Sequence, residues 1–200
     1  MATTAYRIAS YGNPLRSEPS RLGGRFHSAD ETSPTQYLCL HPLGPHAELM
    51  RAADLREEEQ VLAVRARTWA LRLELDGLTE IGFDNAGDFG IRAESLVADD
   101  HAACRRLGGH LRGQLPGLIV PSAALPGTRN AVLFGPRVGS PYLLESLGTV
   151  DVPASVTAEG GRPLATLIQR VRFRGDHHSE LEAWRRGTPY EFEEPDWSAR

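Results

Sequence analysis

The spacing of apolar residues separates candidate strands from candidate helices along this chain. Between Thr68 and Thr79, large apolar residues such as Leu71 and Leu73 alternate with polar or small ones. A period of two is typical of a half-buried strand. Shorter apolar stretches predict further strands at Tyr6–Ser10, Gln36–Leu40, Leu118–Val120, Ala131–Phe134 and Leu164–Arg174.

Other segments place apolar residues at helical spacing. A helix is predicted over His46–Leu55, where Pro45 suits the first helical position and apolar residues from Leu49 onward share one face. This helix would carry Glu48 in its first turn. Two more helices are predicted, the first weakened by a central Gly-Gly pair: Asp99–Leu115 and Ser179–Arg186.

The mixture of short strands and helices predicts an α+β fold. The chain has 200 residues, the usual size of one domain, and shows no internal repeat, low-complexity tract or linker. We therefore expect a single domain over residues 1–200, with its core at about 6–174. The remainder, about 175–200, should hold a C-terminal helix and then a loosely held acidic tail from Tyr190 onward.

Composition narrows the classes of protein that fit. Hydrophobic residues make up 40% of the chain and the formal net charge is −4, so a basic surface for nucleic acid is not expected. No targeting signal is visible at the N-terminus, and no apolar run reaches the roughly 18 residues of a membrane span. We expect a cytoplasmic protein with no membrane association. Cys39 and Cys104 lack the spacing of a zinc site or disulfide framework, so we expect two reduced, buried thiols.

Arg25 and Glu48 are the first candidates for chemistry. Arg25 follows two glycines, and such a backbone can approach a ligand closely while the guanidinium binds paired phosphate oxygens. An ordinary Gly-Gly turn with a solvated arginine is the alternative. Near a helix N-terminus, an ionised Glu48 could stabilise a sugar cation as a glycosidic bond breaks. Glutamates in the first helical turn are also common because they stabilise helices.

Ser122 and Tyr37 are weaker candidates. Ser122 follows the apolar strand that ends near Val120, where ligand-facing groups often lie, but taken alone the residue is better explained as a bystander serine at a strand end. Without a Gly-x-Ser-x-Gly elbow around it, a nucleophilic hydrolase is not indicated. Tyr37 could stack on a planar ring or simply fill a strand position. The histidines do not form a metal-binding pattern, and the glycine-rich stretches lack the context of a dinucleotide fold.

Taken in order, these residues resemble the RES-domain family, which is named for its Arg, Glu and Ser. The matching stretches are Gly23-Gly24-Arg25-Phe26, Tyr37-Leu38, Ala47-Glu48, Val120-Pro121-Ser122-Ala123 and Asn130 to Phe134. Leu73 to Thr79 resembles the family strand that ends in Asp-Leu-Thr, and Ala102 to Leu118 the helix before its Pro-Ser. The resemblance covers about Tyr6 to Arg174.

The resemblance implies an ADP-ribosyltransferase-like fold, in which a split mixed β-sheet with flanking helices surrounds an NAD cleft. It also implies a toxin that cleaves the nicotinamide–ribose bond of NAD, with phosphate or water as acceptor. NAD would be the substrate, with no separate cofactor and no metal. The expected partners are an antitoxin with an Xre-type helix-turn-helix domain and a second copy of the chain. A protein ADP-ribosyltransferase and a non-catalytic module that binds NAD or the antitoxin are the alternatives.

Carried over by position, the family assigns roles to individual residues. Arg25 would hold the pyrophosphate, and Tyr37 would pack against the nicotinamide end. Glu48 would bind the ribose hydroxyl and stabilise the cation, and Ser122 would orient the ribose or phosphate. The family often has Trp-Asn where this chain has Phe26-His27, so these two residues are candidate binding residues whose identity bears on substrate choice.

Overall fold

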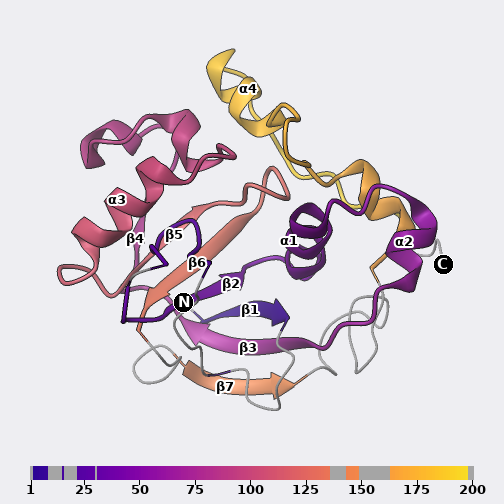
Figure 1. Cartoon of the computed structure of the whole chain (residues 1–200), viewed down its shortest axis with the longest axis horizontal. Helices are drawn as coiled ribbons and strands as arrows, with labels where there is room; N and C mark the ends of the chain where they lie inside the picture. Colours follow the sequence, from indigo (N-terminus) through magenta and orange to yellow (C-terminus); the bar gives the residue numbers. More distant parts are fainter. Residues whose placement is uncertain are drawn as a thin grey trace.

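A mixed β-sheet lies at the centre of the protein, as the computed structural model shows (Figure 1). The sheet has seven strands in the described residues, in the order β4-β5-β6-β2-β1-β3-β7. The structure describes residues 2–8, 15, 22–29, 31–135, 143–148 and 163–197. The strands are β1 (Ala2–Ile8), β2 (Thr35–Cys39), β3 (Thr68–Glu74), β4 (Thr79–Glu80), β5 (Gly117–Pro121), β6 (Arg129–Phe134) and β7 (Leu143–Gly148).

The sheet is split between β1 and β2. These two strands are joined by the single pair Tyr6 and Cys39, whereas β1 and β3 pair along their whole lengths. The β4–β5 pair is parallel and the other pairs are antiparallel. The α+β fold with a split mixed sheet and flanking helices, predicted from the sequence, is therefore confirmed.

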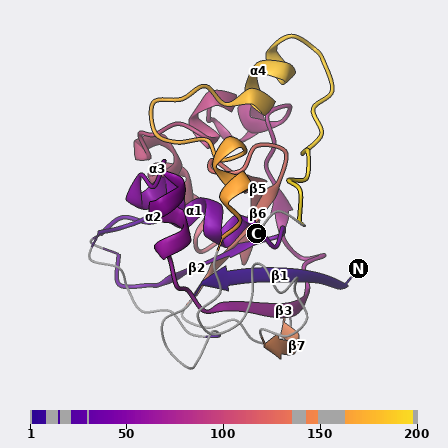
Figure 2. The ribbon, with the colours of Figure 1, turned by 90° about the vertical axis from the view of Figure 1, so that its right-hand side faces the viewer.

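Helices cover the two halves of the sheet separately (Figures 1 and 2). Helix α3 (Ala102–Leu111) packs with the β4–β6 half, and α1 (Gly44–Ala53) lies against β1 and β2 at the split. The remaining helices are α2 (Glu58–Ala63), α4 (Ser179–Arg185) and the short 3-10 helices η1 (Ala86–Phe89), η2 (Ala93–Leu96) and η3 (Ala165–Gln169). Within the described residues, no helix is long and apolar enough to cross a membrane.

Most predicted elements are present with shifts of a few residues at their ends. In β3 the burial alternates as predicted from Leu71 to Leu73, with both leucines buried and Arg72 exposed between them, but Ala70 on the opposite face is buried too. Both cysteines are free and buried, as expected. Residues 9–10 of the first predicted strand lie outside the described residues.

The predicted strand Leu164–Arg174 is wrong. The chain forms η3 there, because Leu167 N–H donates to the Leu164 carbonyl and Arg170 N–H to the Leu167 carbonyl. Buried Leu164 and Leu167 are three residues apart, which matches a 3-10 turn and packs both against α1 and α2. The apolar pattern was therefore that of a buried turn.

The prediction of a loosely held acidic tail is also wrong for the described residues up to 197. Phe192 and Trp197 pack against the cluster around α1, and Glu194 lies 2.8 Å from His41 Nε2. Glu193 pairs with Arg170 of the segment after η3 at 2.9 Å. The acidic letters predicted a solvated tail, but its aromatic residues bury apolar surface and fix its course.

The two central glycines of α3 have different surroundings. A Cβ atom on Gly108 would lie 2.2 Å from the carbonyl oxygen of Phe26, whereas one on Gly109 would meet only a Glu31 carboxylate oxygen at 3.7 Å. Gly108 therefore lets α3 approach the loop that carries Arg25. Arg105 of α3 holds the same loop, because its Nε donates to the Gly24 carbonyl at 2.9 Å.

We expect Gly108→Ala to lower the free energy of unfolding by about 1–3 kcal/mol, because the new methyl group meets backbone that must shift. Gly109→Ala is the matched control and should raise the free energy of unfolding by roughly 0.5–1 kcal/mol through helix propensity. Urea unfolding followed by circular dichroism measures both. Equal stability of the two variants would contradict the packing role of Gly108.

Candidate functional site

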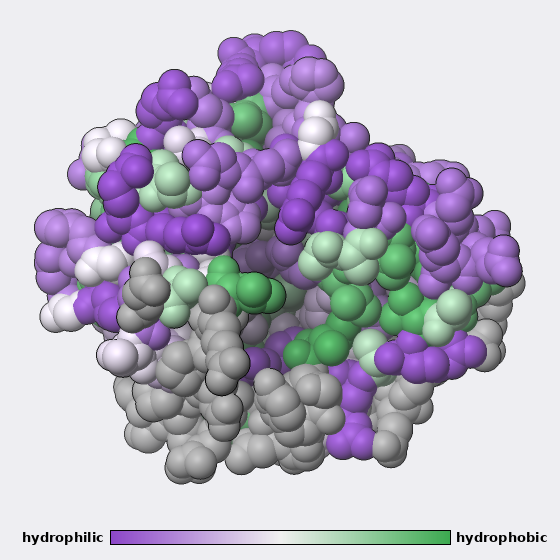
Figure 3. Space-filling model, in the orientation of Figure 1, coloured by the Kyte–Doolittle hydropathy of each residue, from purple (hydrophilic) through white to green (hydrophobic). Residues whose placement is uncertain are grey.

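A cavity of about 280 Å³ opens between α1, the loop that carries Arg25 and the strands β2, β5 and β6. It lies at the split of the sheet, where the two halves diverge. Figure 3 shows the hollow on this face of the protein, with both hydrophilic and hydrophobic residues at its rim. Four of the sequence candidates line it: Arg25 and Phe26 from one loop, Tyr37 from β2 and Glu48 from α1.

Glu48 projects from α1 towards the ends of β5 and β6. Its Oε1 accepts a hydrogen bond from Asn130 Nδ2 at 2.9 Å and a longer one from Ser122 Oγ at 3.4 Å. The predicted place in the first helical turn is wrong: α1 begins at Gly44, two residues earlier than expected, so Glu48 is in the second turn. Its orientation therefore comes from side chains of the sheet and not from free N–H groups at the helix start.

Ser122 is fully buried and lies between the lining residues Pro121 and Ala123. Its Oγ accepts from Leu125 N–H at 3.1 Å and donates towards Glu48. Its backbone N–H donates to the Thr128 carbonyl, and its carbonyl accepts from His178 Nε2 at 3.0 Å. The hydroxyl is therefore placed to hold the Glu48 carboxylate and the turn after β5.

Asn130 is a site residue that the sequence did not single out. It belongs to β6 and lines the cavity beside Glu48. Its Nδ2 makes the shorter of the two bonds to that carboxylate, while its buried Oδ1 has no hydrogen-bond partner among the described residues. The one available signal was its place in the stretch Asn130 to Phe134 that matched the family.

Arg25 is oriented by the backbone of the η2 segment. Its Nη1 donates to the carbonyls of Ala98 at 2.7 Å and Leu96 at 3.2 Å. Burial lowers the pKa of the guanidinium, and Glu48 and Cys104 oppose that shift. An arginine remains charged over the physiological range even so, because its ordinary pKa is above 12. A fixed cation therefore faces the cavity from the side of η2.

Phe26 and Tyr37 build the wall next to Arg25. Phe26 is fully buried, lines the cavity and donates its backbone N–H to Tyr37 Oη at 2.9 Å. A Cβ atom at Gly24 would lie 2.8 Å from Tyr37 Oη and 2.5 Å from His27, so only glycine permits this close approach. The Gly-Gly pair thus brings the backbone against the tyrosine.

His27 lies behind this wall. Its Nδ1 is 2.9 Å from Tyr37 Oη, and burial lowers its pKa. A neutral imidazole can accept the hydroxyl proton while the oxygen accepts from Phe26 N–H. Burial also raises the pKa of Tyr37, which keeps the phenol protonated. His27 therefore does not line the cavity but holds Tyr37, which does.

Glu48 also borders a second cavity next to the first. This second cavity, of about 360 Å³, shares Tyr37, Cys39 and Glu48 with the first and extends along Tyr6 and Leu49. The carboxylate thus lies at the boundary of two cavities, of which the first is lined by Arg25, Arg51 and Arg174 and the second mainly by apolar residues and by Arg7.

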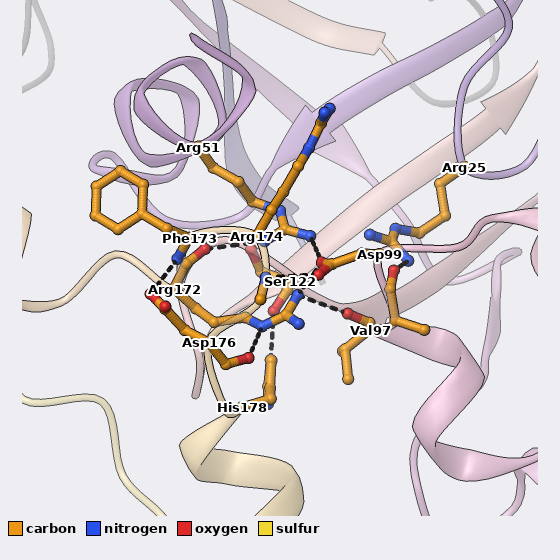
Figure 4. Close-up of polar contacts among 12 residues, drawn as sticks. Arg25, Arg51, Val97, Asp99, Ser122, Arg172, Phe173, Arg174, Asp176 and His178 are labelled. Carbon is orange, nitrogen blue, oxygen red and sulfur yellow. Dashed lines mark hydrogen bonds and ion pairs between the residues drawn. The ribbon is translucent and has the colours of Figure 1, made fainter. Parts of the chain in front are cut away.

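Three further residues of basic type lie on the Arg25 side of the first cavity: Arg51, His101 and Arg174. Arg51 is held by Asp99, whose Oδ1 lies 2.5 Å from its Nη2 (Figure 4). Burial and, after it, nearby arginines, first Arg25, together lower the pKa of His101 to about 4, so its ring is neutral near pH 7. Sequence patterns gave no sign of these residues. Among the described residues, no group of His, Cys, Asp and Glu is placed to hold a metal ion.

Comparisons with known proteins relate this chain to others through structure alone. No protein-family model and no curated protein sequence matches it. A chain from the crystal structure of the M. tuberculosis MbcT–MbcA toxin–antitoxin complex superimposes with a TM-score of 0.60 at 20% sequence identity. This protein shares that fold. The match covers 74% of this chain and 84% of the other.

Proposed function

We propose that the protein cleaves the nicotinamide–ribose bond of NAD at the cavity between α1 and the split sheet. The observation that carries the proposal is that a carboxylate and a guanidinium, of opposite charge, lie on opposite walls of this cavity. Glu48 is oriented by Asn130 and Ser122 on one wall, and Arg25 is fixed by two carbonyls on the other. The pyrophosphate binds Arg25, which places the ribose next to the carboxylate.

The chemistry needs a stabilised cation and little acid catalysis. The C1′–N bond breaks, and its electron pair goes to the pyridinium nitrogen, so nicotinamide leaves as a neutral molecule. The positive charge that develops on the ribose is stabilised by the Glu48 carboxylate. An oxygen of water or phosphate then forms the new bond to C1′, and its proton passes to solvent. NAD is the substrate and no other cofactor takes part.

We further propose that the chain acts as the toxin of a toxin–antitoxin pair. The fold is shared with a chain of a toxin–antitoxin complex, and the sequence resembles the RES-domain family. On this proposal the partners are an Xre-type helix-turn-helix antitoxin and a second copy of the chain, and the target is NAD in the cytoplasm.

Nicotinamide release from NAD by the purified protein tests the proposal. The reaction is run in phosphate and in a phosphate-free buffer, and the second product is identified by mass. ADP-ribose indicates water as acceptor, and its phosphate ester indicates phosphate. Label transferred from NAD to protein would support an ADP-ribosyltransferase instead, and binding of NAD with no nicotinamide release in either buffer would overturn cleavage.

The two side chains that donate hydrogen bonds to Glu48 should contribute unequally to kcat. Asn130→Ala removes the 2.9 Å bond and should lower kcat about 10- to 100-fold with a smaller change in KM, because the carboxylate loses its orientation. Ser122→Ala removes the 3.4 Å bond and should lower kcat less. It should cost roughly 1 kcal/mol of stability, since Leu125 N–H loses its acceptor. Equal kcat values for Asn130→Ala and the parent would contradict this order.

A further inference from the structure

A tight turn between Arg172 and Asp176 is held at both ends by Asp99 (Figure 4). Arg172 Nη1 lies 2.8 Å from Asp99 Oδ1, and Gly175 N–H donates to Asp99 Oδ2 at 2.7 Å. Phe173 N–H donates to the Asp176 carboxylate at 3.1 Å, and Gly175 has a φ of +85° that favours glycine. The backbone on either side of Arg174 is therefore fixed.

The side chain of Arg174 itself is free of such bonds. It extends from the turn past Arg51, and no contact joins its guanidinium in Figure 4. Its guanidinium has no hydrogen bond or ion pair to the residues that the structure describes, yet it lines the cavity. In contrast, Arg51 and Arg172 are both bound to Asp99. This fixed turn therefore presents at the cavity an exposed guanidinium that no described residue pairs with.

The charges around the cavity favour an anion there. Arg25, Arg51 and Arg174 line it, and Asp99 compensates only the pair formed by Arg51 and Arg172. Burial is the largest cause that lowers the pKa of His101, and these three arginines add to it, which agrees with a positive potential at this wall. Glu48 is the opposing carboxylate on the other wall. The paired N–H donors of an arginine guanidinium at this wall match the oxygens of a phosphoryl group in charge and geometry.

We propose that Arg174 binds a phosphoryl group at the mouth of the cavity, as a second anion site beside Arg25, and that Asp99 positions it. The inference rests on the proposed NAD cleavage at this cavity. It names Arg174 as the residue that binds a phosphoryl group in addition to the one at Arg25. Two sources offer the same chemistry: the adenosine-side phosphate of NAD and inorganic phosphate that serves as acceptor.

The experiment compares the parent, Arg174→Gln and the matched control Arg186→Gln, which removes an exposed arginine at the end of α4. Calorimetry measures binding of ADP and, separately, of inorganic phosphate, and neither needs turnover. Steady-state nicotinamide release is then measured over a range of NAD and phosphate concentrations. We expect about a tenfold or larger loss of affinity for one of the two anions in Arg174→Gln only.

The pattern of losses identifies the source. Weaker ADP binding with a raised KM for NAD assigns Arg174 to the substrate phosphate. Weaker phosphate binding with a raised KM for phosphate, and ADP-ribose replacing its phosphate ester as product, assigns it to the acceptor. Unchanged binding of both anions, or equal losses in Arg186→Gln, overturns the site. If the parent binds ADP through Arg174 but releases no nicotinamide, the proposed function fails and the anion site stands.

The positioning role of Asp99 has its own readout. In Asp99→Asn the turn loses two charged contacts, so affinity for the same anion should fall in the same direction as in Arg174→Gln. In the double variant the loss should be less than the product of the two single losses, because both act through one guanidinium. Independent, multiplicative losses would show that Asp99 does not act through Arg174.

Discussion

Glu48→Gln is expected to lower kcat for nicotinamide release by about 10²–10³-fold while the protein stays folded. Glutamine keeps the shape of the side chain and an oxygen that can accept from Asn130 Nδ2 and Ser122 Oγ. It lacks the negative charge that stabilises the ribose cation, so the loss falls on the transition state and KM for NAD changes little. Nicotinamide release at saturating NAD is the measurement.

Glu59→Gln is the matched control for this substitution. Glu59 is exposed on α2, away from the residues that line the cavity, so its variant should keep the parent rate. Urea unfolding should place both variants within about 0.5 kcal/mol of the parent. A Glu48→Gln protein as active as the parent would remove the carboxylate from the mechanism, whatever the fate of the anion sites.

Asp99→Asn is expected to lower the free energy of unfolding at pH 7 by about 1–3 kcal/mol. The carboxylate receives bonds from Arg51, Arg172 and Gly175 N–H, and the side chain of Arg51 is only 6% exposed. Removing the negative charge leaves a buried guanidinium without its partner. The expected loss is below that of a fully buried pair because the Asp99 side chain is 34% exposed.

Asp54→Asn provides the comparison for this ion pair. Asp54 pairs with Arg56 at 2.8 Å, but the two side chains are 66% and 43% exposed, so its loss should cost at most about 0.5 kcal/mol. Asparagine also tolerates the positive φ of 51° at this position. Equal costs at positions 54 and 99 would contradict the structural role given to the Asp99 network.

The loss in free energy of unfolding caused by Asp99→Asn should depend on pH within a defined range. Burial by itself raises the pKa of Asp99, but the Gly175 N–H and the two arginines outweigh burial and hold it at about 2. Because the folded pKa lies below the ordinary value of 3.8, the contribution is present above about pH 4 and is lost as pH falls towards 2. Urea midpoints of parent and variant should therefore converge across this window, and a constant difference would contradict the assignment.

Local patterns were sufficient for β2, β3, β5 and β6 and for part of β1, whereas β4 and β7 were not predicted. The period of two in β3 and the apolar triplet in β5 appear in the structure because one or both faces of those strands are buried. The Gly-Gly pair before Arg25 was expected to let the backbone approach a ligand, whereas the structure shows Gly24 against the side chains of Tyr37 and His27. Where an apolar pattern lay in a buried turn, as at Leu164 and Leu167, the period alone misassigned it.

The sequence by itself determined the α+β class, most of its strands and four residues that meet at one cavity: Arg25, Phe26, Tyr37 and Glu48. Only the tertiary structure decided what orients and surrounds them. Glu48 lies 82 residues from Asn130 in the chain, and Asp99 lies 73 from Arg172. Contacts at such separations depend on how the half-sheets and helices pack, and no local period encodes that packing. Asn130, Asp99 and Arg174 therefore became visible only once the chain was folded.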